Sequence, residues 1–277
     1  MKKLFRRGFL FRLKPSAGIE AHLANYVGAS RFLWNKMLAL NIARLENKQN
    51  LIWYAEMCFW LSLWKKSQEY GFLKESPSQA LQQKLRDLDR AFKDAFDKKQ
   101  PLKRIPKYKR KAMCDTLRYP QGCKLDEANR RVFLPKIGWV SYRKSRSIKG
   151  TPKNITLSRK GKYWYISIQT EYEQEISPHS SLHSSPDSSR SIVGIDMGIK
   201  RFATLSNGEV FQPLNCFGKL QAKLKRYQRR LAKKSKFSAN WKKQRRKISS
   251  LHEQMARTRR DYLHKISAKI SKSHAMV

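Results

Sequence analysis

The stretch that decides the fold reads Ser191-Ile-Val-Gly-Ile-Asp-Met-Gly-Ile-Lys-Arg-Phe-Ala-Thr-Leu-Ser-Asn-Gly208. Its apolar residues 192–195 predict a buried strand that ends at Asp196. A glycine-containing turn then sends the chain back along a second strand over 202–205, which Asn207-Gly208 closes. The stretch therefore predicts an antiparallel strand pair that places one carboxylate at the end of a strand.

Asp196 has two interpretations from the residues alone. Mg²⁺ takes oxygen ligands in near-octahedral geometry, and an Asp fixed on a rigid strand supplies one of them. Two such ions about 4 Å apart can activate water and hold the leaving oxygen of a phosphodiester. Ribonuclease-H-like nucleases present their first catalytic carboxylate on such a strand. An Asp beside glycines is also an ordinary turn residue, so the spacing leaves both interpretations open.

Two long helices are predicted after the strand pair, each with one apolar stripe and a basic remainder. Residues 218–277 hold 20 Lys and Arg but only 2 Asp and Glu, whereas a merely solvated surface normally mixes both signs. We therefore predict a phosphate-binding surface on these helices. The residues expected to carry it are Lys223, Arg226, Arg229, Arg230, Lys233, Lys234, Lys242, Lys243, Arg245, Arg246, Arg257 and Arg260.

The composition of the whole chain points to the same class of partner. Its 277 residues hold 61 Lys and Arg against 20 Asp and Glu, a formal net charge of +41. Such a charge repels itself unless a polyanion neutralises it, and nucleic acid is the polyanion we predict. A membrane partner is not expected, because the charge is spread along the chain and the longest apolar stretch, 53–64, is too short to span a bilayer.

Cysteine usage predicts a cytoplasmic protein. Cys58, Cys114, Cys123 and Cys216 lie far apart and form no CxxC pair, so we expect neither a disulfide framework nor a zinc site. His179 and His183 fall in a Ser-rich segment without nearby cysteines and are interpreted as solvated residues rather than metal ligands.

Upstream of the deciding stretch, the pattern alternates between β and α. Residues 5–13 alternate apolar and basic side chains and predict a strand. A helical region follows over 16–96, in which Ser76-Pro77 is expected to start a helix with its apolar face at Leu81, Leu85, Leu88, Phe92 and Ala95. Phe59, Trp60, Leu63 and Trp64 are interpreted as packing between helices. Short strands are predicted over 131–142 and a hairpin over 155–168. The eight serines of 177–191 predict a flexible linker.

The chain resembles the TnpB (OrfB) proteins of insertion sequences, relatives of the type V CRISPR effectors. No single motif is specific, but many occur in the same order along nearly the whole chain. They are Phe11-Arg-Leu-Lys-Pro15, Arg31-Phe-Leu-Trp-Asn35, Phe72–Gln83, Arg86-Asp-Leu-Asp-Arg-Ala-Phe92, Arg104-Ile-Pro-Lys-Tyr-Lys109, Leu134-Pro-Lys-Ile-Gly-Trp139, the strand pair 194–208, and Arg260-Asp-Tyr-Leu-His-Lys265.

The resemblance implies an α+β fold. A small, wedge-like antiparallel β-barrel (1–15 and 101–176) would hold an inserted helical recognition domain (16–100). After the linker (177–191), residues 192–277 would form an incomplete ribonuclease-H-like (RuvC) α/β domain with the two basic helices.

The resemblance also implies a function. Such proteins are RNA-guided DNA endonucleases, so the implied partners are a guide RNA from the transposon end and target DNA. The implied cofactor is Mg²⁺, with Asp196 as the first catalytic and metal-binding carboxylate. The family's later catalytic carboxylates and zinc ribbon are absent from this sequence, so we expect a C-terminally truncated member that does not cut DNA alone.

Other functional classes stay open. A non-catalytic protein that binds the RNA or DNA of its element and regulates it is the main alternative. A ribosomal-type RNA-binding protein is disfavoured by the 7 Trp and the large helical region. A transposase of the DDE class would need three carboxylates at another spacing, so "transposase" would be a family label here rather than a mechanism.

Overall fold

The computed structural model describes residues 2–111, 115–175 and 192–274. It divides into two compact units, Lys2–Gln174 and a second unit from Glu175 onward. Each unit combines helices with antiparallel strands, so the mixed α and β class predicted from the sequence is confirmed. The predicted linker, with His179 and His183, and the thiol of Cys114 lie outside the described residues.

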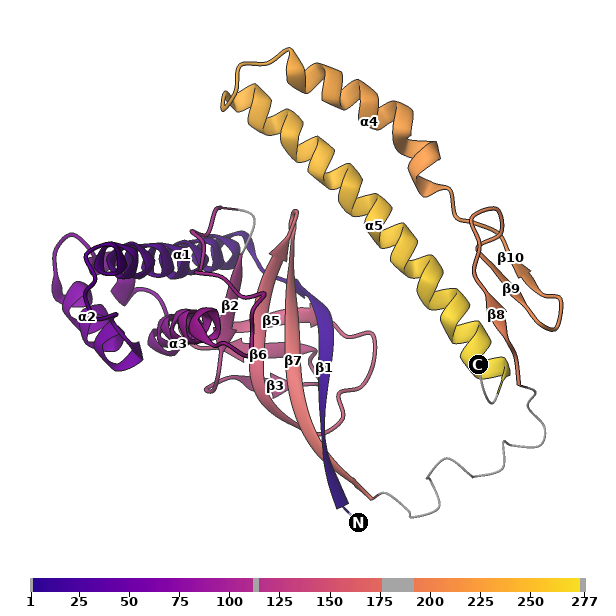
Figure 1. Cartoon of the computed structure of the whole chain (residues 1–277). Helices are drawn as coiled ribbons and strands as arrows, with labels where there is room; N and C mark the ends of the chain where they lie inside the picture. The colour runs from indigo at the N-terminus through magenta and orange to yellow at the C-terminus, as the bar shows by residue number, and fades with distance from the viewer. Residues whose placement is uncertain (1, 112–114, 176–191, 275–277) are drawn as a thin grey trace. The chain divides into compact units, whose positions relative to one another are not determined.

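The first unit opens with one long strand and a helical region. Strand β1 spans Lys2–Lys14, and helix α1 (Ala17–Glu46), helix α2 (Tyr54–Lys66), a 3₁₀ turn (Gly71–Lys74) and helix α3 (Ser78–Phe96) follow it. Six strands come after these helices (Figure 1). They are β2 (Thr116–Tyr119), β3 (Lys124–Asp126), β4 (Arg131–Leu134), β5 (Gly138–Arg143), β6 (Thr151–Lys160) and β7 (Tyr163–Glu175).

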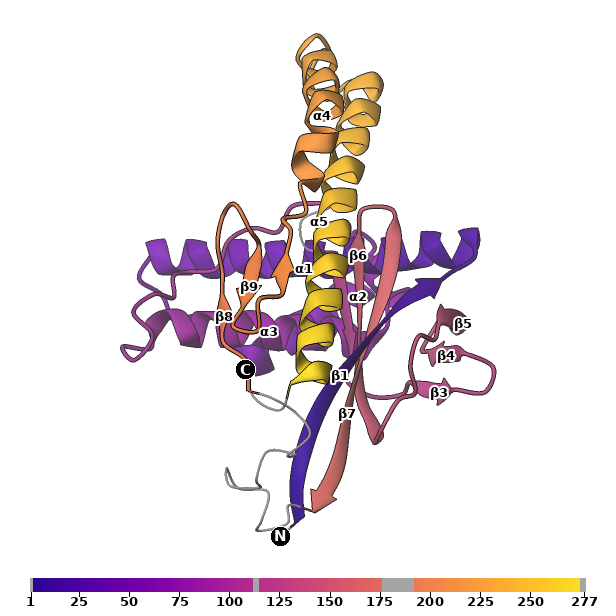
Figure 2. The ribbon, with the colours of Figure 1, turned by 90° about the vertical axis from the view of Figure 1, so that its right-hand side faces the viewer.

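These strands form one curled antiparallel sheet in the order β2-β6-β7-β1-β5-β4-β3. The first strand of the chain therefore lies in the middle of the sheet, beside β7 and β5, as Figure 2 shows for β1 and β7. The predicted hairpin is confirmed: Lys160 pairs with Tyr163 across a tight turn, where Gly161 adopts a φ of 59°. Because β2 and β3 stay at the two ends of the order, the described residues form a half-barrel and not a closed barrel.

One face of the sheet carries the core of this unit. Phe9, Phe11 and Leu13 of β1 are buried there, as the alternation predicted. Leu23 and Tyr26, from the start of α1, pack against the same face. A second core lies between α1, α2 and α3 and contains the predicted stripe Leu81, Leu85, Leu88 and Phe92.

Two local predictions in the helical region are wrong. Pro77 has a ψ of 120°, outside the helical range, so the proline precedes α3 instead of occupying its first turn. Ser76 is buried and does not cap the helix. Phe59 and Leu63 lie on α2 but are 61% and 41% exposed, because α2 packs through Met57, Leu61 and Trp64.

The second unit contains a small sheet and a long helical hairpin. Strands β8 (Ile195–Asp196), β9 (Ala203–Leu205) and β10 (Val210–Phe211) pair antiparallel in that order. Helices α4 (Cys216–Ala232) and α5 (Ala239–Ser273) follow and lie side by side in Figures 1 and 2. Gly208, at a φ of 86°, closes the β9–β10 turn as predicted.

Two cysteine side chains are described by the structure. Cys58 and Cys123 are free, and burial raises the pKa of Cys123 to about 12, which disfavours the thiolate that metal binding needs. Within the described ranges, no helix is long and apolar enough to cross a bilayer.

Candidate nucleic-acid interface

The hairpin of α4 and α5 is set up by caps at both helix starts. The side chain of Asn215 accepts a hydrogen bond from the backbone N–H of Gly218 at 2.9 Å. At the start of α5, the hydroxyl of Ser238 accepts one from the N–H of Trp241 at 3.1 Å. Such caps satisfy backbone donors that the first helical turn leaves unpaired, so each helix begins at a defined residue.

An apolar seam holds α4 and α5 together. Leu224 of α4 is buried with Leu251 and Met255 of α5, and Leu220, Tyr227 and Ile248 pack around them. The buried amide of Gln244 donates to the carbonyl of Tyr227 at 3.0 Å and adds one polar link across the seam. The stripes predicted from the helical spacing therefore face one another, and the basic side chains lie outside the seam.

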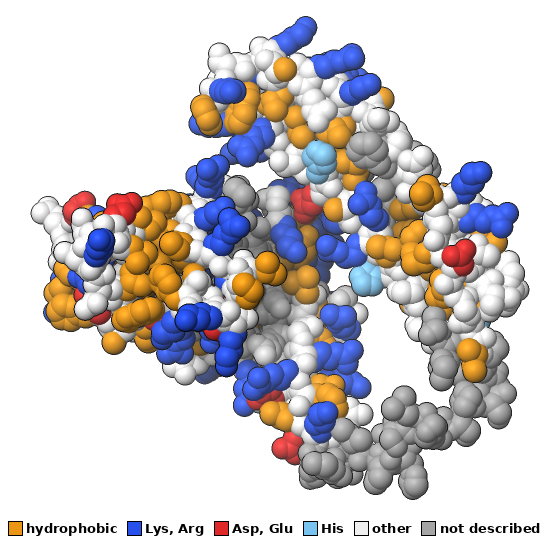
Figure 3. Space-filling model, in the orientation of Figure 1, with side chains coloured by type: hydrophobic (Ala, Val, Ile, Leu, Met, Phe, Trp, Pro, Cys, Tyr) orange, Lys and Arg blue, Asp and Glu red, His pale blue; other side chains and the backbone are white. Residues whose placement is uncertain are grey.

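All but one of the twelve predicted phosphate-binding residues are exposed, and Lys234 is half-buried. Figure 3 shows Lys and Arg side chains projecting from the surface that α4 and α5 form. The two ion pairs described on α5 lie in its C-terminal part, where Lys265 meets Asp261 at 2.8 Å and Lys269 meets Glu209. The end of α4 and the first half of α5 thus present dense positive charge. That this surface binds phosphates stays a prediction.

The apolar seam should determine whether α4 and α5 stay paired, and so whether their basic residues share one surface. Replacing Leu251, which is 4% exposed, by Ala should destabilise the hairpin by about 2 kcal/mol or more. Leu263 lies on the same helix at 44% exposure, and its replacement by Ala should cost less than about 0.5 kcal/mol. Hydrogen exchange of the α4 and α5 amides measures both effects, and equal protection in the two variants would contradict the seam.

The C-terminal part of α5 packs on the small sheet. Ile266 and Ile270 are buried against Val193 and Leu205. The ring of Tyr262 meets that of Phe202 edge-on, with centroids 5.5 Å apart. The helix therefore packs against the strand pair that carries Asp196.

Asp196 lies at the end of the edge strand β8, paired with Thr204 of β9, and its side chain is exposed. The predicted position at a strand end is confirmed. The predicted burial is wrong for Ile192 and Ile195, which are 63% and 39% exposed. Since β8 is at the edge of a sheet of three short strands, the described elements cover only part of its surface.

An open hollow surrounds Asp196. Lys200 and Arg201 line it together with Ser206, whose hydroxyl accepts from the N–H of Gly194 at 3.0 Å. Gly198 suits its turn, because a Cβ there would crowd the carbonyl oxygen of Arg201 at 3.1 Å. The hollow combines one carboxylate with two cations. The cations suit a phosphate group, and the carboxylate is the one group among the three charged side chains that could ligate a metal ion.

Asp196 fits Mg²⁺ as a single oxygen ligand. In the portions of the chain that the structure describes, no three His, Cys, Asp or Glu residues gather into a group that could hold a metal ion. A pair of metal ions needs several carboxylates. The described residues therefore do not fit a two-metal centre by themselves, and no catalytic step is derived through one.

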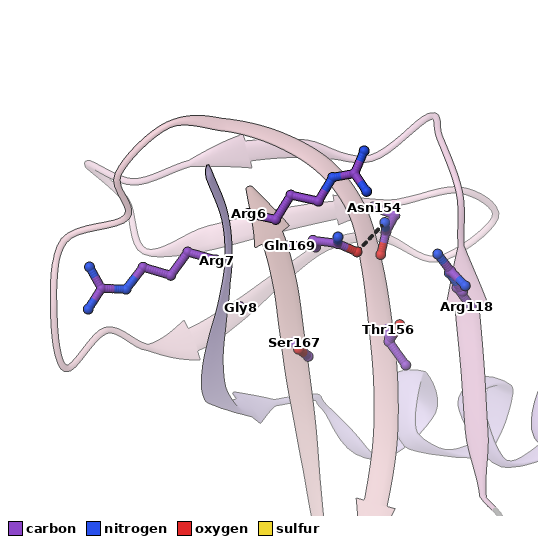
Figure 4. Close-up of a pocket in the computed structure, with 8 residues that line it drawn as sticks. All are labelled: Arg6, Arg7, Gly8, Arg118, Asn154, Thr156, Ser167 and Gln169. Atoms are coloured by element: carbon purple, nitrogen blue, oxygen red, sulfur yellow. Dashed lines mark hydrogen bonds between the residues drawn. The ribbon is translucent and has the colours of Figure 1, made fainter. Parts of the chain in front are cut away.

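A second basic hollow lies on the first unit, on the face of the sheet opposite its core. Arg6 and Arg118 stand on either side of the Asn154–Gln169 pair, whose amides share a hydrogen bond of 2.7 Å, while Arg7 points away (Figure 4). Arg6 also meets Glu171 at 2.8 Å and lowers the pKa of that carboxyl. These arginines were not among the predicted residues, because their grouping depends on the pairing of strands that lie far apart in the sequence.

Comparison with known proteins gives two family-model matches. Residues 167–277 match a model described as "Probable transposase" (OrfB), and residues 1–50 match one described as "Helix-turn-helix domain". In the structure, the described part of 1–50 is a strand and a single long helix, β1 and α1. The second description therefore labels the region and does not describe its fold.

Two relatives are similar to this chain over its whole length. The chain is 47% identical over 277 residues to the "Putative RNA-guided DNA endonuclease InsQ" of Escherichia coli, covering all of this chain and 66% of that protein. It is 31% identical over 282 residues to a "Putative RNA-guided DNA endonuclease" of Streptomyces pristinaespiralis, covering all of this chain and 67% of that one. The chain thus spans about two thirds of the length of both.

Proposed function

Because the chain belongs to the OrfB (TnpB) family of transposon proteins, we propose that it binds a guide RNA and its DNA target through the basic face of α4 and α5. In this proposal it is a nucleic-acid-binding member of a family of RNA-guided DNA endonucleases. The names of its two relatives support this activity. Other RNA-guided enzymes hold the RNA–DNA heteroduplex through its charged backbone and do not read its base sequence.

The observation that carries the proposal is the almost entirely positive charge on the exposed surface of the α4–α5 hairpin. Its apolar residues meet in the seam, and eleven of the twelve proposed binding residues remain exposed. Phosphates are the partners that release counterions and relieve such charge. The proposed contacts are Lys223, Arg226, Arg229, Arg230, Lys233, Lys234, Lys242, Lys243, Arg245, Arg246, Arg257 and Arg260.

The family also supports a proposal for the domains. The sheet formed by 1–15 and 101–176 would be the wedge-like part, and residues 16–100 the recognition helices. Residues 192–277 would be part of a RuvC nuclease domain, with Asp196 as one Mg²⁺ ligand. Mg²⁺, where a complete site holds it, would supply an activated water and charge stabilisation for phosphodiester cleavage.

A second function is favoured by the single carboxylate. Since Asp196 has no group of further ligands within the described residues, the same interface would serve a protein that binds the RNA or DNA of its element without cutting. The two functions share the basic hairpin and differ in cleavage alone.

Binding of the full chain to fluorescein-labelled RNA at a series of salt concentrations tests the shared part. The logarithm of affinity should fall linearly with the logarithm of salt, by about 0.7 per neutralised phosphate of a single strand. With the predicted residues engaged, we expect a slope of roughly four or steeper. Affinity that does not change with salt would overturn the proposal, because phosphate contacts would then contribute nothing.

A further inference from the structure

We propose that residues 103–111, the basic segment, form a second contact with the phosphodiester backbone of nucleic acid, on the first unit of the chain. The inference rests on the proposed function, because it adds a contact to the same partner. The segment reads Lys103-Arg-Ile-Pro-Lys-Tyr-Lys-Arg-Lys111, with six basic residues of nine and no acidic one. It contains neither helix nor strand, so the contacts that hold it come from other parts of the fold.

Side chains of α1 supply those contacts. Asn35 accepts a hydrogen bond from the N–H of Lys109 at 2.8 Å and donates one to the carbonyl of the same residue at 3.0 Å. The indole N–H of Trp34, the residue before Asn35 on α1, donates to the carbonyl of Lys107 at 3.2 Å. The ammonium group of Lys109 lies 3.3 Å from the centroid of the Trp34 ring. The helix thus satisfies backbone groups that a sheet would otherwise pair, and holds the segment against its side.

The remaining charges of the segment face solvent. Arg104, Lys107, Arg110 and Lys111 are exposed, and no carboxylate in the described parts of the chain pairs with them. An ion pair joins Lys103 of the segment to Asp94 at 3.8 Å. The ring of Tyr108 is 53% exposed among these cations. Cations interleaved with an exposed aromatic ring suit a strand whose phosphates bind the charges and whose base stacks on the ring.

Fixing the segment in advance adds to its affinity for such a strand. A free loop with the same charges would lose conformational entropy on binding, whereas this one has already been ordered by folding. The geometry therefore separates two quantities that an experiment can vary independently: the charge of the segment and its attachment to α1.

The charge is tested in the full chain with labelled single-stranded RNA and labelled double-stranded DNA. Changing Arg104, Lys107, Arg110 and Lys111 to Gln should weaken binding at least tenfold and lower the salt slope by about three for a single strand. The control changes Lys48, Lys66, Lys124 and Lys149, which are exposed and outside the segment, to Gln and removes the same total charge. Equal effects of the two sets would overturn the inference. The two probes show which nucleic acid the segment prefers.

The attachment is tested by Asn35→Ala, which leaves every charge in place. We expect a several-fold loss of affinity and faster hydrogen exchange over 103–111. Asn41 is a matched control, because it brackets Ile52 with the same two hydrogen bonds, at 2.8 and 3.1 Å, elsewhere on α1. Asn41→Ala should leave affinity unchanged. If affinity is unchanged in both the Asn35→Ala variant and the charge variant, the inference is overturned but the proposed function is not. If the unaltered chain binds no nucleic acid, the proposed function is overturned as well.

Discussion

Replacing Arg229, Arg230, Lys233 and Lys234 together by Glu is expected to weaken RNA binding by roughly a hundredfold or more at moderate salt. The four residues lie at the end of α4 and just beyond it, where the helix turns toward α5. Each reversal removes one phosphate contact and adds a repulsion, so the salt slope should fall by about three for a single-stranded RNA. A fluorescence-anisotropy titration at several salt concentrations measures both quantities.

The control for this variant separates local contact from total charge. Reversing Lys48, Lys66, Lys124 and Lys149 of the first unit changes the net charge by the same amount. That variant should keep most of the salt slope. If the hairpin variant kept the slope of the unaltered chain, the phosphate-binding face would not be on α4.

The second large effect concerns cleavage. Purified with the RNA that it binds and supplied with Mg²⁺ and target DNA, the 277-residue polypeptide should leave the DNA intact. After Asp196, its sequence holds only Glu209, Glu253 and Asp261 as acidic residues. Glu209 pairs with Lys269 and Asp261 with Lys265, so neither is a free carboxylate on the strand pair.

Asp196→Ala is the matched test of that expectation. It should change neither the absence of cutting nor, by more than about twofold, the affinity for RNA, because one exposed carboxylate adds little to a basic surface. Metal-dependent cutting by the unaltered chain that disappears in Asp196→Ala would contradict the prediction. It would show that the polypeptide assembles a working site around this residue.

Much of the fold could be predicted from the sequence, because the residue patterns that indicate helices, strands and turns involve near neighbours in the chain. The alternation around Phe9 and Phe11 predicted β1, and the spacing of Leu81, Leu85 and Leu88 predicted the buried face of α3. Turn residues such as Gly161 marked a hairpin because an L-residue seldom adopts its backbone angles. Patterns of this kind depend on neighbours in sequence, so no tertiary information was needed.

What sequence reasoning missed depends on distant parts of the chain. Phe59 was expected in a core, but which face of α2 is covered is decided by α1 and α3. Ile195 was expected to be buried, but its strand is at a sheet edge. The attachment of residues 103–111 to Asn35 spans more than seventy residues, and neither motif alone indicates the other.

The candidate interface shows the same division. Helical spacing predicted one apolar stripe on each of α4 and α5, and therefore which basic side chains would be exposed. It did not predict that parts of the two stripes meet in a seam. It did not single out the arginines at the hollow of Figure 4, because their grouping depends on the register of four strands.

The most direct test of the central claim is to crosslink the full chain to its co-purified RNA with ultraviolet light and to identify the crosslinked peptides by mass spectrometry. The account predicts crosslinks in peptides of α4 and of the first half of α5, within residues 223–260. Crosslinks confined to other parts of the chain, or a protein that carries no RNA at low salt, would contradict it.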